Sequence, residues 1–241
     1  MEYRTSCHAR EYVWMKPAKH IIGLITRRDV DAIHEAVSYL PESGKIVEVG
    51  AWVGKSTIAF AEACKKQNKK YSIHTIDRFS GGNILRYYAD IVLNPDFPGM
   101  LMQNFGVTLE QYLDYACKPN RVKYFVNNFI LSPEEHYEHF LTNVSPWDNI
   151  THERIEYDVD TYVFDGQINL MFYDGDHTYD ATYSALNYWN KRLVAGGILC
   201  CHDYEPVYEG AMKAIQQFAQ ENDKELIVPK KSTVVIIKDK D

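Results

Sequence analysis

The stretch KIVEVGAWVGKSTIAFAEACKKQ (45–67) decides the fold, because it passes from an apolar run through a glycine-containing turn into a helix-forming segment. KIVEVG (45–50) has the length and composition of a strand that is buried on both faces. STIAFAEACKKQ (56–67) predicts a helix, and its lysines lie near the end where a helix dipole favours positive charge. A strand followed at once by a helix begins a strand–helix–strand unit, which indicates an α/β protein.

The alternation continues along the chain, with strands marked by apolar runs and helices by apolar residues at helical spacing. Strands are expected at 45–50, 71–76, 122–126, 168–173, 196–201, 225–228 and 232–238. Further helices are expected around three apolar sets: Val30, Ile33, Val37 and Leu40; Ala185, Leu186, Trp189 and Leu193; and Met212, Ile215 and Phe218. Strands that are apolar throughout and alternate with helices indicate a mostly parallel sheet with helices on both faces.

Two segments interrupt this alternation, about 78–121 and about 143–166, and both are expected to be insertions into a single domain spanning residues 1–241. The first contains two helical patterns. The second follows a helix that opens at Ser132, and it contains RIEYDVD (154–160), whose polar–apolar alternation predicts an extra strand or arm. Long insertions at the carboxyl ends of strands in such sheets tend to cover ligand sites.

The composition is that of a globular protein, with 46% hydrophobic and 24% charged residues and a net charge of −7. This balance argues against wholesale binding to nucleic acid or to an anionic membrane. The acidity is concentrated between Glu134 and Asp165, where nine acids stand against one base, Arg154. A neutral or cationic small-molecule partner is therefore favoured over a polyanionic one.

The five cysteines include no CxxC pair, which favours a reducing compartment, and adjacent Cys200 and Cys201 are expected to be buried packing residues. The first residues show no apolar core of signal-peptide length. No window approaches the ~20 apolar residues of a membrane span. We therefore expect a cytoplasmic protein, and the sequence leaves open whether it forms a homo-oligomer.

The turn EVGAWVGKST (48–57) lies close to two nucleotide-binding signatures but fits neither. A phosphate-binding P-loop needs four residues between its first glycine and GK[ST], and only three separate Gly50 from Gly54. The dinucleotide fingerprint GxGxxG fails because Trp52 stands at its second glycine. What fits is acid-x-Gly-x-x-x-Gly, beginning at Glu48. These glycines could also serve only to make a tight strand–helix turn.

Asp77 ends the second expected strand, 29 residues after Glu48, which is enough for one strand–helix–strand unit. An acid at this point can accept hydrogen bonds from both hydroxyls of a ribose, as in other nucleotide-binding folds. The alternative is that Asp77 simply terminates its strand.

The third feature is a pair of polar loops, FYDGDHTYDA (172–181) and CCHDY (200–204), each following an apolar strand. Both loops are therefore expected at the carboxyl edge of the sheet. Oxygen-rich sites suit Mg²⁺ or Mn²⁺, and a nearby histidine is a plausible general base. Asp176 or Thr178 could instead only cap the helix that follows. The expected cluster contains Asp174, Asp176, His177, His202 and Asp203.

Taken in order, EVGAWVGKS, HTID, LMFYDGDHTYDA and GGILCCHDY resemble the class I S-adenosylmethionine methyltransferases, and within them the group of macrocin-type sugar O-methyltransferases and cephalosporin-hydroxylase-like proteins. The resemblance covers residues 45–77 and 168–204 and does not extend to the two insertions. It implies a Rossmann-like sheet of seven strands whose last strand is antiparallel. It also implies O-methylation of a small hydroxylated acceptor, such as a sugar or natural product, with S-adenosyl-L-methionine as methyl donor.

The resemblance further implies the site residues. Glu48 would pair with the amino-acid end of the donor, and Gly50 would let the backbone approach its adenosine part. Trp52 could stack on the adenine, although a buried hydrophobic role is an equal alternative. The expected donor-binding set is Glu48, Gly50, Trp52, Gly54, Ser56, Asp77 and Asp174.

For the chemistry, the resemblance implies Mg²⁺ or another divalent cation on Asp174 and Asp203, with His177 as general base. His202 stands where many metal-dependent relatives have a second acid, and it is the third expected metal ligand. Because imidazole favours softer ions than Mg²⁺, the identity of the cation stays open.

Three other functions remain open from the residues alone. A nicotinamide-dependent oxidoreductase could use the same sheet, although Trp52 in place of glycine disfavours it. A non-catalytic member of the family could bind the donor without transferring methyl groups. A metal-dependent hydroxylase could use two histidines and one carboxylate, a set that His177, His202 and either Asp174 or Asp203 could supply.

Overall fold

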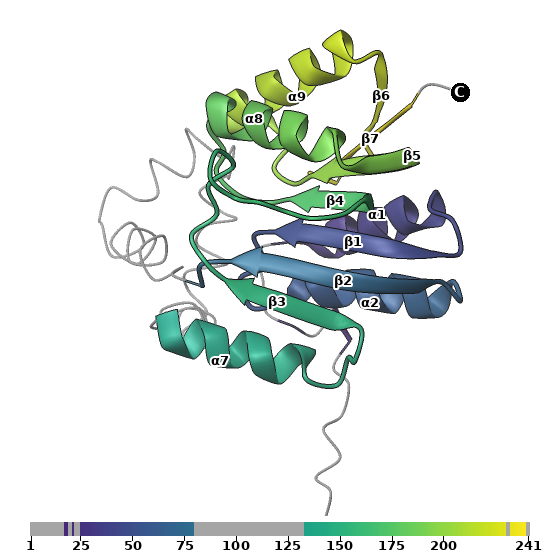
Figure 1. The fold of residues 1–241 in the computed structure, drawn as a ribbon, viewed down its shortest axis with the longest axis vertical. Coiled ribbons are helices and arrows are strands. Elements are labelled where there is room, and N and C mark those ends of the chain that lie inside the picture. The colour runs from purple at the N-terminus through teal and green to yellow at the C-terminus, as the bar shows by residue number, and fades with distance from the viewer. Residues whose placement is uncertain (1–16, 19–20, 22–24, 80–132, 230–231, 240–241) are drawn as a thin grey trace, which may run out of the picture.

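The computed structural model describes residues 17–18, 21, 25–79, 133–229 and 232–239. Within them the chain forms one seven-stranded sheet, in the order β3-β2-β1-β4-β5-β7-β6 (Figure 1). Neighbouring strands pair in parallel except at β7, which is antiparallel to both β5 and β6. The α/β fold class and the antiparallel last strand are thus confirmed. The strands are β1 (Ser43–Val49), β2 (Lys70–Asp77), β3 (Ile150–Arg154), β4 (Ile168–Tyr173), β5 (Leu193–Cys201), β6 (Lys224–Ile227) and β7 (Val235–Asp239).

Helices cover both faces of the sheet, as the sequence predicts. One face is covered by α1 (Arg27–Ser38), α2 (Lys55–Lys66) and α7 (Pro133–Val144). The other face is covered by α8 (Tyr179–Asn190) and α9 (Glu209–Glu221). A short 3₁₀ helix, η2 (Pro206–Tyr208), comes directly before α9. None of the described helices has the length and apolar character needed to cross a membrane.

The central strands β1, β4 and β5 each supply both hydrophobic cores, because successive side chains of a strand point to opposite faces. Cys200 packs into the core beneath α1 and α2, whereas Cys201 packs into the core beneath α8 and α9. Both cysteines are free and buried, and burial raises the pKa of each thiol. The prediction that they are packing residues is therefore confirmed.

Two sequence-based predictions are wrong in detail. Leu193, expected at the end of a helix, begins β5, because α8 already ends at Asn190. The segment 143–166, expected to be an insertion, contains the edge strand β3, which pairs with β2 along Ile150–Arg154. The expected strand or arm at 154–160 therefore shares only Arg154 with a real strand. The expected strand at 122–126 and nearly all of the expected insertion at 78–121 lie outside the described residues.

Gly50 makes the turn after β1 possible. Its φ is +86°, a conformation that side chains disfavour, and a Cβ built on it would lie 2.0 Å from the carbonyl oxygen of Asp174. Gly54 also has a φ of +86° and begins α2. The interpretation that these two glycines form a tight turn between strand and helix is thus confirmed. Gly50 in addition lets the loop after β4 lie against the turn after β1.

Replacing Gly50 with alanine should destabilise the fold by about 3–5 kcal/mol, because backbone strain adds to a clash with main-chain atoms. Gly196→Ala is the matched control, since Gly196 has a φ of +72° but no heavy atom within 4 Å of a built Cβ. It should cost only about 1 kcal/mol. Urea unfolding measures both. Equal losses for the two variants would show that contact with Asp174 does not constrain the turn.

Candidate active site

The site lies at the carboxyl edge of the sheet, where backbone hydrogen bonds between neighbouring segments continue beyond the ends of the central strands. The amide of Gly50 donates to the carbonyl of Ile76 at 2.9 Å, and the amide of Asp174 donates to the carbonyl of Val49 at 2.8 Å. Past β4 and β5, the amide of His202 donates to the carbonyl of Tyr173 at 3.1 Å. The first residues after β1, β4 and β5 are therefore fixed side by side at the carboxyl edge.

Asp77, the last residue of β2, holds the glycine turn. Its Oδ2 accepts hydrogen bonds from the amides of Ala51 and Trp52, both at 2.7 Å, and its Oδ1 accepts one from the amide of Phe79 at 2.5 Å. These bonds also stabilise Trp52 at a φ of +50°, which is uncommon for a bulky side chain. Asp77 is thus hydrogen-bonded to the glycine turn after β1, the turn that the sequence analysis places in the same binding site.

Glu48, near the end of β1, is fully buried. Its Oε2 accepts hydrogen bonds from the hydroxyls of Thr57 (2.5 Å) and Thr75 (2.9 Å), whereas its Oε1 makes no hydrogen bond within the described structure. Burial raises the pKa of Glu48, nearby hydroxyls oppose it, and the resulting pKa is about 7. A buried carboxyl with one unused oxygen fits a residue that awaits a polar partner.

Helix α7 covers the turn. A Cβ on Gly54 would lie 3.1 Å from Phe140 of this helix, so Gly54 lets the helix pack closely, and its role in donor binding stays a prediction. The indole Nε1 of Trp52 donates to Nε2 of His136 at 3.3 Å, and His136 is fully buried. Ser56, another expected donor residue, is also buried. The sequence gives no sign of His136, because α7 is distant in the chain and its histidine belongs to no motif.

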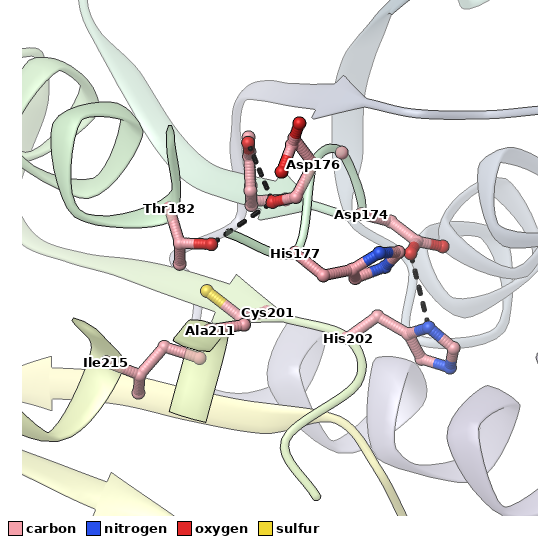
Figure 2. A pocket seen from close by; sticks show the side chains of 10 residues that line it. Asp174, Asp176, His177, Thr182, Cys201, His202, Ala211 and Ile215 are labelled. Carbon is pink, nitrogen blue, oxygen red and sulfur yellow. Dashed lines mark hydrogen bonds and ion pairs between the residues drawn. The ribbon is translucent and has the colours of Figure 1, made fainter. Parts of the chain in front are cut away.

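The expected catalytic residues do come together. Asp174, His177 and Asp203 each offer one ligand atom, and these atoms lie within 4.8 Å of one another. Nε2 of His177 lies 2.7 Å from Oδ2 of Asp203. Figure 2 shows the carboxylate of Asp174 beside the imidazole rings of His177 and His202. A small cavity of about 10 Å³, the space of a single water, lies against this group.

His202 lies beside the two carboxylates with which the sequence groups it. Its Nδ1 lies 3.2 Å from Oδ1 of Asp174 and 3.1 Å from Oδ1 of Asp203, and its Nε2 lies 3.8 Å from Oδ2 of Asp29. Burial alone would lower the pKa of His202, but the surrounding carboxylates raise it well above its usual value. His202 thus lies against both carboxylates of the cluster, and its role as a metal ligand stays a prediction. The same carboxylates favour the protonated form of its imidazole.

Asp29 is a buried residue of the site region that the sequence analysis misses. It lies in the first turn of α1, where Thr26 and Asp29 form a reciprocal capping box. Its other oxygen accepts from the hydroxyl of Ser232 at 2.8 Å and the amide of Thr233 at 2.9 Å. Burial alone would raise the pKa of Asp29, whereas its bonds, with that of His202 foremost, lower it far below its usual value. The only sequence signal is the Thr-x-x-Asp spacing, which predicts a helix cap and not a site residue.

The ligand atoms that Asp174, His177 and Asp203 offer fit a divalent cation. Nε2 of His177 is buried and makes no hydrogen bond of good geometry within the described residues, although Asp203 is 2.7 Å away. Burial lowers the pKa of His177, but Asp203 outweighs it, so the pKa is raised. Asp203 has a φ of +57°, the kind of backbone strain that persists at functional sites. Two carboxylates with one imidazole suit Mn²⁺, Fe²⁺ or Mg²⁺.

The neighbouring polar residues have structural roles. Thr178 caps α8, its hydroxyl accepting from the amide of Ala181, and Asp176 accepts from the amide of Thr178 at 2.7 Å. Of the two residues that could cap the helix, Thr178 is thus confirmed as its cap, and Asp176 supports the turn that leads into it. Tyr208 stacks on His177, with ring centroids 4.4 Å apart, and fixes its orientation.

A mostly parallel sheet with polar clusters at its carboxyl edge defines a ligand-binding α/β protein of the Rossmann-like class. Residues 47–204 match the family described as a methyltransferase domain. Because the match covers more than half of the chain, this protein belongs to the methyltransferase-domain family, as its sequence motifs predict. No curated protein matches the chain.

Solved structures show the same fold. The O-methyltransferase NovP is similar over 89% of this chain and 80% of its own, at 17% identity and a TM-score of 0.54. The calicheamicin enzyme CalS11, a TDP-rhamnose 3'-O-methyltransferase, is similar over 88% of this chain and 78% of its own, at 18% identity and a TM-score of 0.47. A methyltransferase of Podospora anserina bound to S-adenosylhomocysteine matches over 88% and 76%, at 14% identity and a TM-score of 0.46. The likeness to NovP supports the fold.

The variant Glu48→Gln should change how stability depends on pH. The pKa of Glu48 is about 7 in the folded protein, against 4.5 for an ordinary glutamate, so the folded state binds the proton more tightly than the unfolded chain. The free energy of unfolding of the wild type should therefore fall, relative to the variant, by up to about 3 kcal/mol as the pH rises through this window. Urea unfolding from about pH 4 to pH 8 measures it. A difference that is constant with pH would contradict a raised pKa.

Proposed function

We propose that the protein is an S-adenosylmethionine-dependent O-methyltransferase that acts on a small hydroxylated acceptor, such as a sugar or natural product. One observation carries this proposal: in a member of the methyltransferase-domain family, the Asp174–His177–Asp203 cluster lies at the same sheet edge as the glycine turn. The likeness in fold to NovP, an O-methyltransferase, agrees with it.

The donor would occupy the turn after β1. Asp77 already accepts three amide hydrogen bonds, two at Oδ2 and one at Oδ1, which leaves an acceptor position on Oδ1 for a ribose hydroxyl. The unused oxygen of Glu48 would pair with the ammonium group at the amino-acid end of the donor. Because this ligand has no pyrophosphate, the turn needs no P-loop or dinucleotide glycines.

Methyl transfer would be an in-line displacement. The acceptor oxygen forms a bond to the methyl carbon while the carbon–sulfur bond breaks, and S-adenosylhomocysteine leaves as a neutral thioether. The proton of the acceptor hydroxyl passes to His177, whose raised pKa and contact with Asp203 make it a stronger base than a free imidazole. Holding both reactants in line would supply much of the acceleration.

The carboxylates of Asp174 and Asp203 would hold a divalent cation, with His177 within reach as a third donor. When bound, such an ion draws in the acceptor hydroxyl and lowers its pKa. Nε2 of His177 cannot accept a proton and bind a cation at the same time. We therefore propose the two carboxylates as the principal ligands and His177 as the base.

Donor binding tests the first half of the proposal. Calorimetry should show that the wild type binds S-adenosylhomocysteine, and that Asp77→Asn weakens this binding about 10–100-fold, because it removes charge-assisted hydrogen bonds to the ribose. Asp31→Asn, an exposed carboxylate of α1, is the control and should bind normally. A wild type that binds neither S-adenosylmethionine nor S-adenosylhomocysteine would sink the proposal.

The cluster is tested by a second pair of variants. Asp203→Asn should lower methyl transfer by at least about 100-fold and weaken Mn²⁺ binding, while Asn tolerates the left-handed backbone at this position. Asp176→Asn lies in the neighbouring loop, outside the cluster, and should leave both unchanged. Undiminished turnover after chelation would show that no cation is needed, and the proposed role of His177 as base would stand. Undiminished turnover in His177→Ala would remove the base.

A further inference from the structure

His136 has a defined tautomer. The indole N–H of Trp52 can only donate, so Nε2 of His136, at 3.3 Å, must accept. Burial lowers the pKa of His136 and keeps its ring neutral. The charges of nearby Asp77 and Glu135 raise this pKa, and His139 lowers it further, so that the net shift is downward. A neutral imidazole that accepts at Nε2 carries its proton on Nδ1.

This Nδ1–H is a buried donor with no acceptor. The side chain of His136 is fully buried, and its Nδ1 has no hydrogen-bond partner within the described part of the chain. Buried polar groups without partners are rare and each calls for a physical reason. Since an apolar side chain would fill this space without the penalty, the unused donor points to a ligand atom that completes it.

His136 lies beside the turn at which the methyl donor is expected to bind. Asp77 holds the amide of Trp52, and the indole of Trp52 contacts His136 edge-on, with ring centroids 5.8 Å apart. His136, Trp52 and Asp77 thus form one continuous set against the turn after β1. His136 lies in the first turn of α7, the helix that covers this turn, and far from the Asp174–His177–Asp203 cluster in the chain.

We propose that His136 recognises the adenosine part of the methyl donor, its Nδ1–H donating to an oxygen or ring nitrogen of the nucleoside while Trp52 fixes its tautomer. This inference rests on the proposed function and adds to it a binding residue from α7. His136 is then a donor-binding residue, and Trp52 positions it in addition to any contact of its own with the ligand.

Two substitutions separate the two ring nitrogens. The side-chain amide of Asn reaches the position of Nδ1 and can supply the missing donor, whereas the amide of Gln reaches the position of Nε2 and serves Trp52 alone. His136→Gln should weaken S-adenosylhomocysteine binding about 10-fold, and His136→Asn should keep it within about 3-fold of the wild type. His139→Gln, an exposed histidine of the same helix, should bind normally. Calorimetry gives the affinities, and thermal unfolding gives the stability of each variant.

Fragments of the ligand locate the contact. By ligand-observed NMR, adenosine should lose affinity for His136→Gln by the same factor, and methionine should not. Equal donor affinity in wild type and His136→Gln, or equal losses in the Asn and Gln variants at equal stability, would overturn the role of His136 and leave the proposed function standing. A wild type that binds no S-adenosylhomocysteine would instead overturn the proposed function itself, and this inference with it.

Discussion

The contact between the backbone of Gly50 and the carbonyl of Asp174 is the constraint on which the rest of the site depends. Only a residue without a side chain allows the turn after β1 to lie this close to the loop after β4. The sheet ladder continues through both residues, from Ile76 through Gly50 and from Val49 to Asp174. The glycine turn and the carboxylate cluster are therefore parts of one rigid edge, which is what a transfer between two bound molecules requires.

Charge is the second organising feature. His202 is buried among Asp29, Asp174 and Asp203, and these carboxylates raise the pKa of its imidazole; in its protonated form it offsets their mutual repulsion. Asp29 in turn is held by the cap of α1 and by the segment that enters β7. The first helix and the last strand thus support the same cluster.

Much of the fold could be predicted because its signals are local. A few adjacent residues suffice to indicate the glycine turn, the apolar strands or a helix cap. The site residues Asp77, Asp174, His177 and Asp203 stand at or after the ends of strands, and these ends meet at one edge of the sheet. The edge strand β3 gives no strand signal because Ile150–Arg154 (ITHER) contains a single apolar residue and none of its residues is fully buried.

Asp29 and His136 were missed for a different reason. Each acts through contacts with residues far away in the sequence: Asp29 through His202, and His136 through Trp52. A single sequence carries no record of such pairs, and each residue by itself resembles an ordinary helix residue. The acceptor is not predicted either, because the cavity beside the cluster has a volume of about 10 Å³, the space of a single water, and its shape names no acceptor.

We propose that one sheet edge holds the methyl donor with its sulfur toward the Asp174–His177–Asp203 cluster. A crystal structure of the protein grown with S-adenosylhomocysteine and Mn²⁺ tests this directly. We expect electron density with the ribose hydroxyls on Asp77, the sulfur facing the cluster, and the cation on Asp174 and Asp203. A nucleoside bound elsewhere, or with its sulfur turned away from the cluster, would contradict the account.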